Sequence, residues 1–97
     1  MLMPQSSRHL AAIMFTDIVG YTALMDKDED AAFEMLERNR AIHGEVIRKY
    51  QGKFLKEMGD GILASFPTVT DAIYSAGYIQ RACETEEHLD LRIGIHQ

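Results

Sequence analysis

The stretch FTDIVGYT, from Phe15 to Thr22, and the stretch KEMGDG, from Lys56 to Gly61, decide how this chain is interpreted. Each places one aspartate, Asp17 or Asp60, at the end of an apolar, strand-like run and beside a glycine where the chain changes direction. Both alternating sets of residues from Leu10 to Ile18 are apolar, which is typical of a strand at the centre of a sheet. The two aspartates are therefore expected at strand ends.

The rest of the sequence predicts two helices and three further strands. Acidic residues followed by an apolar repeat favour a first helix from about 28 to 50, ended by Gly52. Gly59-Asp60-Gly61 between the short runs 54–58 and 62–66 is a strong hairpin signal, with Asp-Gly as the turn. Thr68 with Asp71 resembles a capping box for a second helix, and 91–95 reads as a last strand.

This order predicts an α+β, ferredoxin-like βαββαβ fold, an antiparallel sheet with two helices on one face. The apolar repeats predict the buried stripe of each helix: Phe33, Leu36, Ile42, Val46, Ile47 and Tyr50 in the first, and Val69, Ala72, Ile73, Ala76, Ile79 and Cys83 in the second.

Length and composition bound the remaining possibilities. With 97 residues and 46% hydrophobic content, the chain suits one small domain, expected over 10–97 after a flexible lead-in over 1–9. The net charge of −5 argues against a nucleic-acid partner. We expect no membrane span and no signal peptide, because no apolar run approaches the roughly 20 residues of a span and the start is polar.

Cysteine and histidine offer no site of their own. Cys83 is the only cysteine, which excludes a disulfide framework and favours a buried helical residue in a reducing, cytoplasmic setting. The four histidines, which are His9, His43, His88 and His96, lack metal-ligand spacing and are expected at the surface or in packing roles.

The residues around Asp17 and Asp60 could carry metal-dependent phosphate chemistry. Gly20 allows close backbone approach, so successive N–H groups there could cradle phosphate oxygens, with the Thr22 hydroxyl as a further donor. In a βαββαβ sheet the first strand lies beside the third, which would let Asp17 and Asp60 share metal ions. Taken singly, Asp17 could merely begin a loop and Asp60 could serve only its turn.

Lys56 occupies an unusual position for a charged residue. By simple alternation it lies on the same side of its strand as the apolar residues Phe54 and Met58. Either it is an edge lysine whose charge reaches solvent, or it makes a selective contact with a base or phosphate.

FTDIVGYT, a helix, and KEMGDG in a hairpin together resemble the first half of a class III nucleotidyl cyclase catalytic domain. The resemblance implies conversion of ATP to cyclic AMP and pyrophosphate. It also implies that Asp17 and Asp60, with the Ile18 carbonyl, hold two Mg²⁺ or Mn²⁺ ions. Lys56 would read the purine, since lysine there goes with ATP and glutamate with GTP; the neighbouring Glu57 weakens that assignment.

By the same resemblance, Gly20, Tyr21 and Thr22 would contact the β- and γ-phosphates, mainly through backbone N–H groups. The family usually has phenylalanine where Tyr21 stands. Family members work as head-to-tail homodimers, so each protomer would lend Lys56 to the site that is built on its partner's metals.

The sequence stops at Gln97, before the family's second purine contact and its transition-state asparagine and arginine. We therefore expect the isolated chain to be nearly inactive. Two alternatives remain open: a diguanylate cyclase-like domain, although the turn MGDG does not match that family's hairpin, and a non-catalytic nucleotide-binding or dimerisation module on the same fold.

Overall fold

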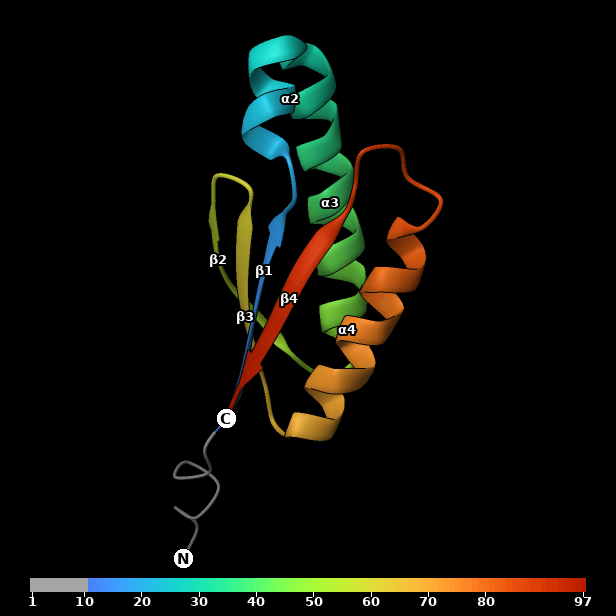
Figure 1. The fold of residues 1–97 in the computed structure, drawn as a ribbon. Helices are drawn as coiled ribbons and strands as arrows, with labels where there is room; N and C mark the ends of the chain where they lie inside the picture. Colours follow the sequence, from blue (N-terminus) through green and yellow to red (C-terminus); the bar gives the residue numbers. More distant parts are fainter. Residues whose placement is uncertain (1–10) are drawn as a thin grey trace, which may run out of the picture.

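The computed structural model describes residues 11–97 (Figure 1). The expected lead-in over 1–9 and the residue Leu10 lie outside this range. Within the described range no helix is both long enough and apolar enough to cross a membrane.

The sheet has the predicted topology. Its strands are β1 (Ala12–Ile18), β2 (Lys53–Met58), β3 (Gly61–Phe66) and β4 (Leu91–His96), in the order β2-β3-β1-β4. β1 pairs antiparallel with both β3 and β4, and β2 pairs antiparallel with β3. The first strand is therefore central and lies beside the third, as the ferredoxin-like order requires.

Two long helices, α3 (Glu29–Lys49) and α4 (Val69–Cys83), cover one face of the sheet (Figure 1). Thr68 is confirmed as the N-cap of α4, because its Oγ1 accepts from the Asp71 N–H at 3.1 Å. The Asp71 carboxylate accepts in return from the Thr68 hydroxyl, at 3.0 Å, in place of the backbone N–H of a regular capping box. A third helix, α2 (Tyr21–Lys27), was not predicted; it packs against α3 beyond the end of the sheet (Figure 1).

Asp28 separates α2 from α3. The predicted helix from about 28 to 50 is confirmed as α3, to within one residue at each end. The backbone of Asp28 leaves the helical region, and its carboxylate accepts from the Ala31 N–H at 3.1 Å, which makes it the N-cap of α3. The sequence concealed α2 because seven residues, none of them fully buried, give too short an apolar repeat to recognise.

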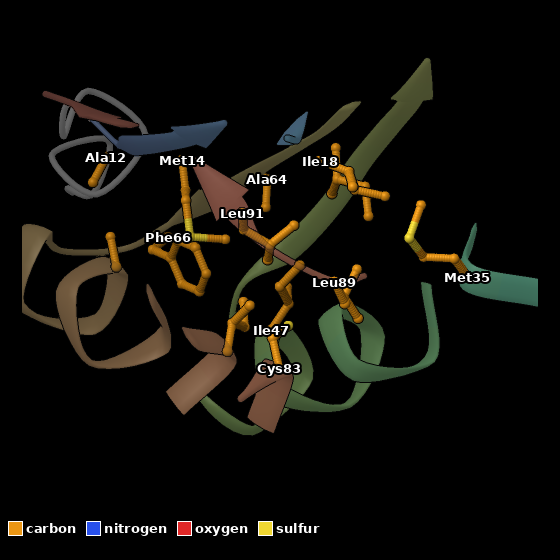
Figure 2. Packing of buried hydrophobic residues seen from close by; sticks show 13 residues of the cluster. Ala12, Met14, Ile18, Met35, Ile47, Ala64, Phe66, Cys83, Leu89 and Leu91 are labelled. Atoms are coloured by element: carbon orange, nitrogen blue, oxygen red, sulfur yellow. The ribbon is translucent and has the colours of Figure 1, made fainter. Parts of the chain in front are cut away.

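The core lies between the sheet and the long helices. Alternate residues of the central strands point into it, so Met14, Ala64 and Phe66 meet Ile47 of α3 and Cys83 of α4 (Figure 2). Leu89 and Leu91 close the core next to the start of β4.

The buried stripes of the helices differ in part from the prediction. Phe33 and Ile73, expected inside, are 50% and 55% exposed. The prediction is confirmed for four fully buried residues: Ile47, Ala72, Ile79 and Cys83. The other fully buried helical residues were not predicted: Ala32, Met35, Asn39, His43 and Ser75. Asn39, His43 and Ser75 were missed because apolar periodicity does not count a polar side chain as buried.

The end of α3 corrects the role given to Gly52. Gln51, not Gly52, adopts the left-handed conformation, with a φ of 63°, and the Gly52 N–H closes the helix end by donating to the Ile47 carbonyl at 2.8 Å. Gly52 is needed for another reason: a Cβ there would lie 2.5 Å from the Phe66 ring.

Replacing Gln51 by glycine should stabilise the protein. A non-glycine residue in the left-handed region costs roughly 1–2 kcal/mol, of which the extra chain entropy of glycine takes back about half, so we expect a gain of about 0.5–1 kcal/mol in unfolding free energy. Urea denaturation measures it. Gly52→Ala, the neighbouring control, should lose roughly 1–3 kcal/mol through overpacking. A Gln51→Gly variant no more stable than wild type would contradict this account of the helix end.

Candidate functional site

The face of the sheet away from the helices is open, and it carries the candidate site. Because directly paired residues share a face, Phe15, Asp17, Leu63, Arg92 and Gly94 all lie on it. Phe15 is 52% exposed, and its ring lies across Gly94, where a Cβ would sit 2.4 Å from the ring. The open face is therefore apolar at its middle and charged at the end where β1 finishes.

Asp17 lies at that end, directly opposite Arg92 of β4. Arg92 Nε donates to Asp17 Oδ1 at 2.9 Å, and both side chains are open to solvent. The sequence interpretation missed Arg92. Its signal was the alternation of the last strand, LRIGIH, in which Arg92 is a charged residue on the face shared with Asp17.

Asp60 reaches the same end of the sheet from the β2–β3 hairpin. Gly61 starts β3, and Thr16, the residue before Asp17, pairs with Ile62. The two-residue turn is Gly59-Asp60, with a positive φ only at Gly59, as in a type II′ turn, so the predicted Asp-Gly turn is wrong by one residue.

The charges of both aspartates act on the Arg92 guanidinium. The hydrogen bond and the charge of Asp17 raise the pKa of Arg92, and the charge of Asp60 raises it further. Arg92 is paired with Asp17 and also senses the charge of Asp60 from the neighbouring hairpin. The strand register places Asp17 and Asp60 at the same end of the sheet, because Thr16 pairs with Ile62 and Asp60 directly precedes Gly61.

Gly20, Tyr21 and Thr22 lie next along the chain from Asp17. Gly20 adopts a φ of 79° and begins α2 without any side-chain cap, so the first N–H groups of this helix receive no side-chain acceptor. Thr22 is exposed, whereas Tyr21 packs its ring against the core, which leaves its backbone N–H as the group available to a ligand.

These residues fit a metal ion whose remaining ligands are the phosphate oxygens of a substrate. Within residues 11–97 no cluster of three or more His, Cys, Asp or Glu side chains could hold a metal ion. Mg²⁺ is commonly bound through only one or two carboxylates plus substrate phosphates. Two carboxylates beside an uncapped, glycine-led turn suit a metal–polyphosphate and not a stand-alone metal.

Lys56 lies on the open face, but not for the reason given by simple alternation. It pairs with Leu63, whereas Phe54 pairs with Ala64 on the helix side, because β2 contains a bulge between Phe54 and Lys56. The prediction that Lys56 and Phe54 share a side is wrong. Glu57 pairs with Ile62 on the helix side, where its carboxylate accepts from Arg40 Nε at 2.8 Å.

A buried polar chain supports β1 beneath Asp17. Thr16 Oγ1 lies 2.9 Å from His43 Nε2, and His43 Nδ1 lies 2.8 Å from the Asn39 carbonyl oxygen. The carbonyl can only accept, so Nδ1 carries hydrogen and Nε2 accepts from the Thr16 hydroxyl. Burial lowers the pKa of His43, against the Asn39 hydrogen bond and the charge of Glu57, which raise it.

Comparisons with known proteins agree with this geometry, although no family model matches the chain. The chain is 31% identical over 97 residues to "Putative adenylate cyclase 3" of Rhizobium meliloti (strain 1021), a match that covers 92% of this chain and 16% of that protein. It is 32% identical to the solved adenylate/guanylate cyclase/hydrolase of Silicibacter pomeroyi, with a TM-score of 0.76, covering 88% of this chain and 54% of that one.

The chain belongs to the class III nucleotide cyclase catalytic domains. The fold agrees as well with a bacterial light-regulated adenylyl cyclase, at a TM-score of 0.81 and 24% identity, covering 88% of this chain and 51% of that one. This cyclase domain therefore spans about half the length of these two solved chains and 16% of the Rhizobium protein.

Acidification should destabilise this cyclase domain through His43. Because the pKa of His43 is lowered in the folded state, the unfolded chain binds the proton first, so stability is complete above pH 6.5 and falls as the pH drops below it. One such group contributes a slope of up to about 1.4 kcal/mol per pH unit. Urea unfolding at several pH values should show this slope.

His43→Gln should flatten the slope whatever its own stability, and His96→Gln, which changes an exposed histidine, should keep it. An unchanged slope in His43→Gln would rule out this residue as the cause.

Proposed function

We propose that this domain converts ATP to cyclic AMP and pyrophosphate in a two-metal reaction. The observation that carries the proposal is that the register of β1 with β3 brings Asp17 and Asp60 to the same end of the sheet. The supporting observation is the glycine-led, uncapped start of α2 directly after Asp17. A cyclase domain of this family with that arrangement has the groups needed to hold a metal-bound triphosphate.

Each residue has a distinct part in the proposed reaction. Asp17 and Asp60, with the Ile18 carbonyl, would hold two Mg²⁺ or Mn²⁺ ions. When bound, such ions neutralise phosphate charge and lower the pKa of the attacking ribose 3′-hydroxyl. Gly20, Tyr21 and Thr22 would orient the β- and γ-phosphates through backbone N–H groups, which places the α-phosphate toward the carboxylates.

We also propose that residues of two copies meet at the site, head to tail. Side chains at the charged end are exposed, 44% for Asp17 and 73% for Arg92, so one chain alone forms an open edge and not an enclosed pocket. Phe15 and Met58, more than half exposed on the same face, give a second copy an apolar surface to cover. Lys56 of one protomer would then reach the purine of the nucleotide whose triphosphate is bound at its partner's metals.

Calorimetric titration with Mn²⁺–ATP tests the metal–triphosphate site without requiring turnover. We expect the wild type to bind and Asp17→Asn to lose at least roughly tenfold in affinity, because even outer-shell changes at metal sites cost that much. Asp30→Asn, an equal charge change at an exposed residue of α3, should bind like wild type. Equal binding by Asp17→Asn and wild type would refute the site. No binding by either, at concentrations where the chain is dimeric, would favour a non-catalytic module.

Lys56→Glu tests the purine preference. Adenine N1 accepts a hydrogen bond, which the Lys56 ammonium can donate, whereas guanine N1 carries hydrogen and needs an acceptor. Wild type should bind Mn²⁺–ATP in preference to Mn²⁺–GTP, and the variant should shift that ratio toward GTP by roughly 10–100-fold, the worth of a hydrogen bond to a charged group.

Lys53→Glu makes the same charge change in the same strand, opposite Ser65, and should leave the ratio unchanged. Sedimentation of each variant establishes that the compared samples are dimeric. An equal shift in both variants would mean that overall charge, and not the Lys56 contact, sets the preference.

A further inference from the structure

Two residues of opposite charge, Lys56 and Glu57, are neighbours in the edge strand β2. Neighbours in a regular strand point to opposite faces. The register of β2 against β3 therefore decides which of the two charges is presented on the open face, where the proposed function places the purine contact.

The bulge sets this register. Lys53 pairs with Ser65 and Phe54 with Ala64, but the next pair is Lys56 with Leu63, so Leu55 has no partner opposite it. Leu55 is accordingly 48% exposed. Past the bulge, Lys56 takes the open face and Glu57 takes the helix side.

A regular strand would reverse this result. If Leu55 paired with Leu63, Lys56 would move opposite Ile62 on the helix side, and Glu57 would move opposite Gly61 on the open face. The hairpin would then have a three-residue loop in place of the two residues Gly59 and Asp60, and both loop lengths are common. The slipped register is thus compatible with a common hairpin loop length.

Contacts from α3 favour the bulged register. Arg40 Nε donates to Glu57 Oε1 at 2.8 Å, and the Glu57 charge also acts on His43, which is buried beneath the sheet. These contacts exist only while Glu57 lies on the helix side. The ion pair of Arg40 with Glu57 therefore opposes the slip that would bring a carboxylate onto the open face.

We propose that the Leu55 bulge, held by the Arg40–Glu57 ion pair, is a specificity device that presents Lys56 and conceals Glu57, so that the domain selects ATP over GTP. Arg40 is therefore a positioning residue: by pairing with Glu57 it keeps the Lys56 side chain on the open face. The inference rests on the proposed function, since it concerns the purine contact of the same site.

Arg40→Gln gives the test, with Mn²⁺–ATP and Mn²⁺–GTP affinities measured on the dimeric chain. Losing an exposed ion pair should raise the population of the slipped register about two- to fivefold. If GTP binds mainly in that register, its affinity rises by the same factor, while ATP affinity, set by the major register, hardly changes. A merely structural defect would weaken both nucleotides together.

Three companion variants sharpen the test. Arg40→Gln/Glu57→Met removes the side-chain acceptor for guanine, and it should show no gain for GTP. Deleting Leu55 in the Arg40→Gln background leaves Phe54, Lys56 and Glu57 opposite Ala64, Leu63 and Ile62 without a bulge, and it should also show no gain. The control is Arg38→Gln, a change on the same helix as Arg40. It breaks the 2.7 Å ion pair of Arg38 with Glu86 and should change neither affinity.

Cross-strand nuclear Overhauser effects report the register separately from binding. Wild type should show Lys56 opposite Leu63, and Arg40→Gln should add a minor set with Leu55 opposite Leu63. Unchanged GTP affinity in Arg40→Gln, or an equal gain after deletion of Leu55, would overturn the inference alone. Failure of every variant, wild type included, to bind Mn²⁺–nucleotide would overturn the proposed function and the purine preference with it.

Discussion

The pairing of β1 with a strand on each side is the constraint on which the rest of this domain depends. Its alternate residues divide the molecule: Met14 and Ile18 enter the core, while Phe15 and Asp17 lie on the open face. A slip of one residue would move Asp17 into the core and Met14 onto the open face. The core residues of β1 therefore fix the site as firmly as any contact within the site does, because burial of the apolar set decides where the carboxylate lies.

Topology was predictable from the sequence, because the hairpin signal, the capping box and the doubly apolar first strand each have a local physical cause. The residues that fill the space between layers were less predictable. Asn39, His43 and Ser75 are buried although they are polar, and Phe33 is half exposed although it is apolar. Their places depend on which side of a helix meets the sheet, and that is settled by packing between elements and not by the helix alone.

The candidate site was predictable where it depended on strand ends, and not where it depended on strand faces. Asp17 and Asp60 come together because adjacent strands bring their ends together. Arg92 escaped notice because a single arginine in a short strand has no meaning until its partner strand is known. The prediction that Lys56 shares a face with Met58 is confirmed, whereas the prediction that it shares a face with Phe54 is wrong. A bulge between Phe54 and Lys56, which the alternation of residue types does not indicate, places these two on opposite faces.

The edge strand bears the part of the site most open to change. β1 is held on both sides and by the core, so its register is strongly specified, whereas β2 has one neighbouring strand and mostly exposed side chains. The place of Lys56 on this strand, and with it the proposed purine contact, depends on two weak features: one unpaired leucine and one exposed ion pair. In the proposed site Asp17 lies on the rigid central strand and Lys56 on the adjustable edge strand, so a change in the register of β2 would alter the proposed purine contact and leave Asp17 in place.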